Sequence, residues 1–96
     1  MDPISHLSTV HVKSFVTGAS GGELVEFAFT KPGTEPASGD WHTAEWEPPT
    51  PTGCTARLLI GPDGGFDVGV GTWDMWVKAT GLVEKPAFNT GQVPIV

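Results

Sequence analysis

The fold is decided by residues 66–79, which read FDVGVGTWDMWVKA. Apolar side chains alternate with polar or small ones along both halves of this stretch, as in strands with one buried face. The apolar residues of 66–70 have even numbers, whereas those of 73–79, apart from Trp76, have odd numbers, so the phase changes at Gly71-Thr72. A single straight strand would expose one of the two sets. We therefore expect a strand, a corner at Gly71 and a second strand that faces the same core.

The same alternation recurs along the rest of the chain. It predicts strands at 7–16, 24–29, 41–47 and 54–60, and a last strand at Val93 and Ile95 after a loop at Glu84-Lys85-Pro86. Segments rich in Gly and Pro separate these strands at 17–22, 31–40, 47–53 and 61–65, and no window has helical periodicity. Six or seven short strands predict an all-β antiparallel sandwich, with a small closed barrel as the alternative. The expected core comprises Val25, Phe27, Phe29, Leu58, Ile60, Trp73, Met75 and Val77.

Length and composition limit the classes of function. Ninety-six residues suffice for one domain, 1–96, in which residues 1–6 would form an N-terminal arm. Five basic against 11 acidic residues give a net charge of -6, which argues against binding to nucleic acid or to an anionic membrane surface. No signal peptide or membrane-length apolar run is present, so we expect a complete protein made in the cytosol. A single Cys excludes a disulfide within the chain and a Cys-rich zinc site.

No motif predicts catalysis, a cofactor or a metal. The glycine-rich segment 17–22 precedes a strand rather than a helix, which favours a hairpin turn over a dinucleotide site. The other reactive side chains fit structural roles: His6, His11 and His42 at the surface or rim, Glu45 and Glu47 on an outward strand face, and Cys54 in the core. The sequence therefore predicts a protein that is not an enzyme.

The four tryptophans are many for so short a chain. Strand parity places Trp46 and Trp73 inside, and Trp41 and Trp76 on the opposite faces of their strands. If these two strands are neighbours in one sheet, Trp41 and Trp76 share an outer face and are candidate partner-binding residues. Two alternatives remain open. The loop 31–40 or the N-terminal arm would bury both rings, or a bulge before Trp46 would turn Trp41 inward.

Residues 71–77, GTWDMWV, resemble the Gly-x-Tyr-x-hydrophobic-x-Val run that opens the penultimate strand of immunoglobulin-like sandwiches. The resemblance implies an immunoglobulin-like sandwich of about seven strands. Trp73 stands where the corner tyrosine is usual and Met75 where the cysteine is usual. Neither an inter-sheet disulfide nor a corner hydrogen bond through a hydroxyl is therefore implied. Trp46 would be the core tryptophan of the third strand.

A second resemblance covers most of the chain: residues 2–13, 25–29, 39–46, 71–78 and 84–86 are similar to small proteins encoded in the structural gene cassettes of actinobacterial tailed phages. It implies a non-enzymatic virion accessory, foremost a capsid decoration protein on the major capsid protein, in many copies. It further implies synthesis in the host cytoplasm, location in the virion, and no catalytic residues or cofactor. The alternatives are a head–tail connector or tail accessory protein, and a carbohydrate-binding module that holds a surface glycan on exposed tryptophans.

Overall fold

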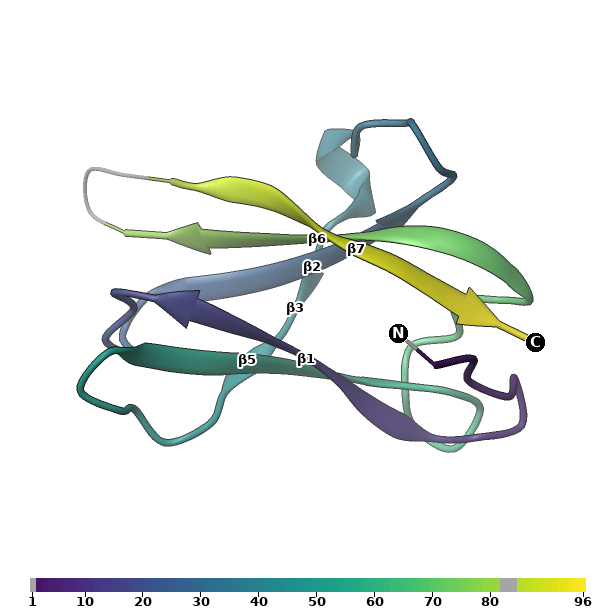
Figure 1. Ribbon diagram of the computed structural model, residues 1–96, viewed down its shortest axis with the longest axis horizontal. Coiled ribbons are helices and arrows are strands. Elements are labelled where there is room, and N and C mark those ends of the chain that lie inside the picture. The colour runs from purple at the N-terminus through teal and green to yellow at the C-terminus, as the bar shows by residue number, and fades with distance from the viewer. Residues whose placement is uncertain (1, 82–84) are drawn as a thin grey trace.

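The computed structural model describes residues 2–81 and 85–96 as a sandwich of two antiparallel sheets (Figure 1). One sheet has the order β1 (Val10–Thr17), β5 (Gly53–Ile60), β4 (Glu45–Trp46). The other has the order β3 (His42–Thr43), β2 (Leu24–Thr30), β6 (Gly71–Thr80), β7 (Ala87–Ile95). The only helical element in the described ranges is one 3-10 turn, η1 (Ser38–Asp40). The predicted all-β, immunoglobulin-like sandwich of about seven strands is confirmed.

The core lies between the two sheets, where inward side chains of all the long strands meet. Phe27 and Val77 face each other across the β2–β6 ladder and are completely buried. Cys54 is also completely buried, as predicted for an apolar position on β5. The other predicted core residues are either buried or partly buried against this cluster, namely Val25, Phe29, Leu58, Ile60, Trp73 and Met75. No helix in the described residues has the length and apolar character needed to cross a bilayer.

The corner at Gly71 is present, but the strand expected before it is not. Gly71 has a φ of 147°, and the Trp73 indole N–H donates to the Gly69 carbonyl at 3.0 Å. The indole therefore makes the corner hydrogen bond that a tyrosine hydroxyl makes in other immunoglobulin-like sandwiches. Residues 61–70 form a loop, whose Phe66 has one isolated bridge to Ile60. Val68 packs on the core as expected, whereas Val70 is 65% exposed.

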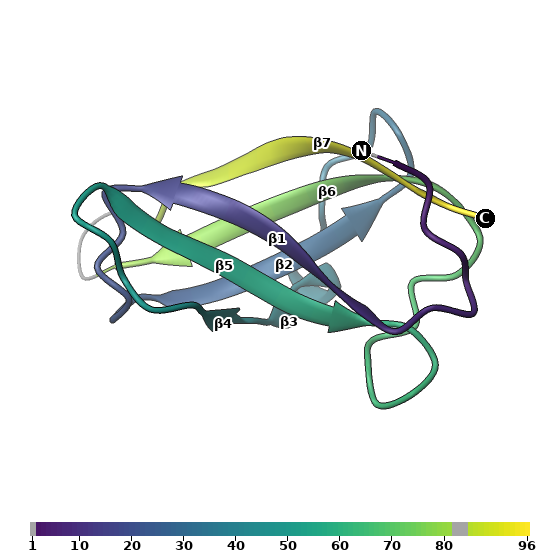
Figure 2. The same cartoon turned by 60° about the horizontal axis from the view of Figure 1, so that its bottom comes forward.

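The strand expected at 41–47 is divided between the two sheets. β3 pairs with β2, and β4 pairs with β5, so the chain changes sheets at Ala44 (Figure 2). The Ala44 N–H donates to Val25 of the four-stranded sheet, and the Glu47 N–H donates to Thr55 of the three-stranded sheet. Ala44 and Trp46 still pack on the core, as their parity predicted. Parity passes unchanged through such a crossing, which is why the sequence pattern suggested one strand.

One further expectation is corrected by this crossing. Trp46 does not lie on a third strand beside the penultimate one. It lies on β4 of the opposite sheet, where its indole N–H donates to the Glu23 carbonyl at 2.7 Å. β2 is the strand paired with the penultimate strand β6, and its fully buried aromatic residue is Phe27. The loop predicted at 84–86 is described for Lys85 and Pro86, and Glu84 lies outside the described residues.

Candidate functional site

The structure places Trp41 and Trp76 on the same outer face but not on neighbouring strands. β2 lies between β3 and β6, which corrects the expected adjacency. Trp76 and Lys78 both point outward from β6, and the Lys78 ammonium lies 4.4 Å from the centroid of the Trp41 ring. Lys78 also lies 3.7 Å from a Glu26 carboxylate oxygen. Lys78 thus contacts the half-buried Trp41 across β2, and the half-buried Trp76 lies two residues from Lys78 on the same face of β6.

The loop 31–40 covers part of this face (Figure 1), but it does not bury both rings, as one of the two alternatives required, because Trp41 and Trp76 both stay half-buried. The Gly33 N–H donates to the Asp74 carboxylate at 3.1 Å, and the Thr30 hydroxyl donates to the Thr34 carbonyl at 2.6 Å. The Trp76 indole N–H donates to the same Thr30 hydroxyl oxygen at 3.2 Å. Thr30 and Asp74 are 5% and 7% exposed although both lie on an outer face. A second, polar cluster therefore holds the loop on the sheet, and partner binding by the two tryptophans remains a prediction.

An open groove of about 580 Å³ lies along the side of the sandwich where the chain changes sheets. One part of its wall is aromatic: the His42 ring stacks on Phe66 with 3.8 Å between centroids, and Trp41 lies beside them. The opposite part is charged, because the Arg57 guanidinium donates to Glu45 at 2.8 Å. The groove thus combines aromatic surface with hydrogen-bonding groups, which is the combination that a polar, ring-shaped ligand requires.

The outer face of the three-stranded sheet carries a row of ion pairs. Lys13 lies 2.7 Å from Glu47, while Arg57 contacts Glu45 at 2.8 Å and Glu47 at 3.8 Å. The hydrogen bond from Lys13 lowers the pKa of Glu47 below its ordinary value of 4.5, and the charges of Lys13, Arg57 and His11 act in the same direction. Glu45 and Glu47 therefore lie on an outward face, as predicted, and each is paired with a cation.

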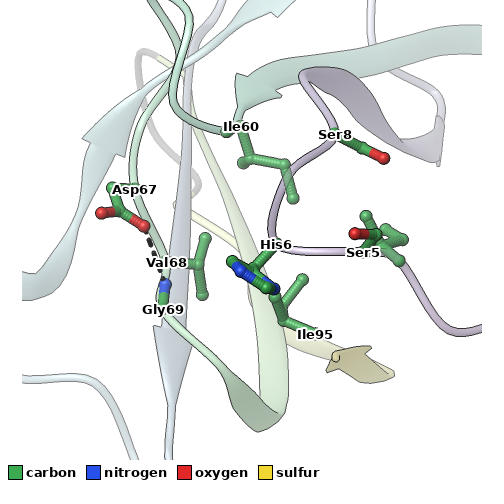
Figure 3. Close-up of a pocket in the computed structure, with 10 residues that line it drawn as sticks. Ser5, His6, Ser8, Ile60, Asp67, Val68, Gly69 and Ile95 are labelled. Atoms are coloured by element: carbon green, nitrogen blue, oxygen red, sulfur yellow. Dashed lines mark hydrogen bonds between the residues drawn. The ribbon is translucent and has the colours of Figure 1, made fainter.

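One end of the sandwich carries both chain termini and several exposed apolar side chains. The N-terminal segment runs beside β7, because Ile4 bridges Ile95 and the His6 ring N–H donates to the Val96 carbonyl at 2.8 Å. Figure 3 shows the His6 ring beside Val68 and Ile95. The cavity there has a volume of only about 10 Å³, so it is too small for a ligand larger than one water molecule. Four apolar side chains are exposed at this end: Leu7, Val10, Val70 and Val96.

The remaining reactive groups have structural partners. The Cys54 thiol is buried and donates to the Ala19 carbonyl at 3.2 Å. Glu23 accepts hydrogen bonds from the amides of Ser20 and Gly21 in the β1–β2 turn. The pKa of Glu23 is lowered chiefly by a hydrogen bond from its own backbone amide. His6 and His11 are exposed and His42 is half-buried at the groove, as predicted for surface or rim histidines. Across residues 2–81 and 85–96, no three His, Cys, Asp or Glu side chains are grouped as metal ligands would be.

Sequence reasoning missed two surfaces: the apolar end and the groove. Leu7, Val70 and Val96 are far apart in the chain, and only the β6–β7 ladder and the arm bring them to one end. The groove exists because β3 and β4 belong to different sheets, which the unbroken parity concealed. Comparisons with protein-family models, with curated proteins and with solved structures give no match. Proposals about function therefore depend on the geometry above and on the resemblance of the sequence.

Proposed function

We propose that this chain is a non-enzymatic structural accessory of a bacteriophage virion, foremost a capsid decoration protein that docks on the major capsid protein in many copies. The sequence resemblance suggests the virion, and the fold is suited to the role. A two-layered sandwich offers a rigid body with distinct ends and faces, so it can dock by one surface and leave the others to solvent. Many copies on a lattice make even a weak contact persistent.

The exposed apolar end is the observation that carries this proposal. Leu7, Val70 and Val96 are 75%, 65% and 59% exposed, which are the highest values among the large apolar residues of the described chain. Gly71, the first residue of β6, pairs with Ile95 at the end of β7. Val70 and Val96 are the chain neighbours of these two paired residues, so both lie at this end of the sheet. Leu7 follows His6, whose N–H donates to the Val96 carbonyl at 2.8 Å. Exposed apolar side chains gathered at one place are typical of an interaction surface.

Purified particles provide the first test. Mass spectrometry of virions should detect the chain in a copy number comparable to that of the major capsid protein. A few copies per particle would favour the connector or tail alternative instead. If the chain is absent from purified particles, the proposal is wrong.

The docking end is tested with matched variants on particles that lack the protein. Leu7→Glu combined with Val70→Glu should abolish co-sedimentation with the particles while the unfolding temperature stays near normal, because both side chains are exposed. Leu24→Glu combined with Phe88→Glu is the control, since these residues are also exposed but lie towards the other end of the strands. Trp41→Ala and Trp76→Ala test the tryptophan face in the same assay. Equal attachment by all variants would contradict docking through the apolar end.

A glycan-binding module is the second candidate, and the groove is the observation that favours it. Trp41 and the His42–Phe66 stack supply aromatic surface for a sugar ring, and Glu45 and Arg57 supply hydrogen-bonding groups. A glycan array followed by tryptophan fluorescence titration tests this candidate directly. Binding that is lost in Arg57→Ala and kept in Lys85→Ala, an exposed lysine outside the groove, would favour the module. No binding across the array would exclude it.

A further inference from the structure

β1 is a long sheet edge with nothing paired to its outer side in the described structure. It is the first strand of the three-stranded sheet and pairs only with β5. Its eight residues, VHVKSFVT, contain neither Pro nor Gly. The opposite edge strand of the same sheet, β4, has only two residues, as does β3 in the other sheet. Natural proteins rarely leave a long regular edge open, because it is a template for another strand.

β7, the other long edge, is protected in three ways. Pro94 lacks an N–H, Gly91 has a φ of 119°, and the β6–β7 register shifts between Met75 and Trp76. The N-terminal segment also occupies its end through the Ile4–Ile95 bridge. Each of these features interrupts strand pairing. The contrast between the two edges is therefore built into the sequence of each strand.

The ladder identifies which backbone groups of β1 are free. The β1–β5 register runs from Val10 opposite Ile60 to Thr17 opposite Gly53. The next pair along the chain is hydrogen-bonded, because the Gly18 N–H donates to the Thr52 carbonyl at 2.9 Å. Hydrogen-bonded pairs alternate in an antiparallel ladder, so even-numbered residues of β1 turn their backbone groups towards β5. The odd-numbered residues turn theirs outward. Four N–H and four C=O groups are thus left at the edge, those of His11, Lys13, Phe15 and Thr17.

The charge on this edge does not protect it. Lys13 is the only lysine of β1, and an edge lysine commonly prevents strand addition. Here its ammonium lies 2.7 Å from Glu47, which follows β4 on the far side of β5. The side chain therefore crosses the sheet away from the free edge, and its charge is matched within the same molecule. Phe15, beside the edge on the same face, is 48% exposed.

β1 is complementary to itself in one antiparallel register. With Ser14 opposite Ser14 of a second copy, all eight free groups find partners, because His11 faces Thr17 and Lys13 faces Phe15. The small, half-buried Ser14 lies at the close, non-hydrogen-bonded position on the two-fold axis. A shift of the axis to Lys13 would oppose two lysines, and a shift to Phe15 would leave the groups of His11 without partners. Of these three registers, only the one about Ser14 has neither fault.

We propose that two copies of this chain associate through β1, in antiparallel register about Ser14, to form one continuous six-stranded sheet. In this pairing Val12 meets Val16 of the second copy on the inner face, which extends both cores across the junction. The Lys13 stem packs on Phe15 of the second copy on the outer face. The contact is small, so the dimer is weak in dilute solution and depends on concentration. The proposal is independent of the proposed virion role, because the purified chain alone tests it.

Cysteine cross-linking tests the register. Ser14→Cys should form a disulfide-linked dimer under mild oxidation, because residues at a non-hydrogen-bonded pair lie about 4.5 Å apart at Cα, within disulfide range. His11→Cys is the control: the two introduced thiols would lie about 20 Å apart in this register, so no disulfide-linked dimer should form. A mixture of His11→Cys and Thr17→Cys should cross-link as a heterodimer, because those positions face each other.

Charge variants at Phe15 test the contact by sedimentation over a range of concentrations. Phe15→Lys places a lysine opposite Lys13 of the second copy at two symmetry-related positions, and the dissociation constant should rise about tenfold. Phe15→Glu removes the same ring but places a carboxylate there, so the dimer should persist. A chain that is monomeric at every concentration, a dimer that Ser14→Cys does not cross-link, or equal effects of the two Phe15 variants would each overturn the proposal. Occupation of β1 by a segment of another protein, with no self-association, would overturn it as well.

Discussion

The two outer faces of the sandwich differ in what lies over them. On the four-stranded sheet, the loop 31–40 folds back and buries Thr30 and Asp74 with hydrogen bonds to its backbone. On the three-stranded sheet, every outward side chain is at least partly exposed, and the ion pairs of Lys13 and Arg57 lie in solvent. The first face therefore contributes to the stability of the monomer, whereas the second is free for other molecules.

This difference changes how the aromatic residues are interpreted. The Trp76 ring is half-buried, and its N–H is hydrogen-bonded to Thr30, whose hydroxyl also binds the loop at Thr34. Phe15 has no comparable partner and lies beside an unpaired edge. Phe15, on the outer face of the three-stranded sheet, is thus better placed for binding than the larger Trp76 on the outer face of the four-stranded sheet.

Replacing one aromatic residue on each face gives the largest expected difference. Trp76→Ala should lower the free energy of unfolding by about 2–4 kcal/mol, because it removes a half-buried ring and the hydrogen bond to Thr30. Phe15→Ala should change it by no more than about 0.5 kcal/mol, since its ring is largely solvated. Urea unfolding of dilute protein, below the concentration of self-association, measures both. Equal losses would mean that the two faces are not distinct.

The Asp74 carboxylate is the next point at which the covered face can be disrupted. Asp74→Ala removes the acceptor of the Gly33 N–H and should cost about 1–3 kcal/mol, because the site is buried. Asp74→Asn keeps a carbonyl oxygen at the same place and should cost less. Thermal unfolding gives the stability, and amide hydrogen exchange at Gly33 shows whether the loop has detached. Fast exchange at Gly33 in the unmodified protein would contradict the covered face.

The sequence predicted the layers of this fold well because burial sets the parity of strands. Phe27, Val77 and Cys54 each belong to a period-two row of apolar side chains, and all three are fully buried. Parity does not report which sheet a strand joins. The segment 41–47 kept its alternation while it crossed from one sheet to the other at Ala44. The error in placing Trp46 and in making the strand of Trp41 a neighbour of β6 follows from that.

The candidate site was less predictable, because it depends on contacts between distant segments. The burial of Thr30 and Asp74 requires a loop whose sequence shows only that it is irregular. The exposed end requires the N-terminal segment to run beside β7. The free edge of β1 requires knowing that no strand precedes it in the sheet, and its regular sequence alone does not reveal that.

The ion pairs on the outer face of the three-stranded sheet give the smallest expected effect on stability, and this effect depends on pH. Folding lowers the pKa of Glu47 from 4.5, so its carboxylate stabilises the folded state at pH values above 4.5. That contribution is lost as the pH falls below 4.5 and through the lower pKa that Glu47 has in the folded state, because the carboxylate then becomes protonated in the folded state as well. Glu47→Gln should flatten the fall in stability over this acidic range and change little at neutral pH, where surface pairs contribute weakly. Unfolding temperatures measured from pH 7 to pH 3 provide the comparison.

Glu23→Gln is the control for an acid outside this face, since Glu23 also has a lowered pKa but acts within the β1–β2 turn. If Glu47→Gln left the fall in unfolding temperature at acidic pH unchanged while Glu23→Gln reduced it, the ion pairs on the outer face of the three-stranded sheet would have no part in stability.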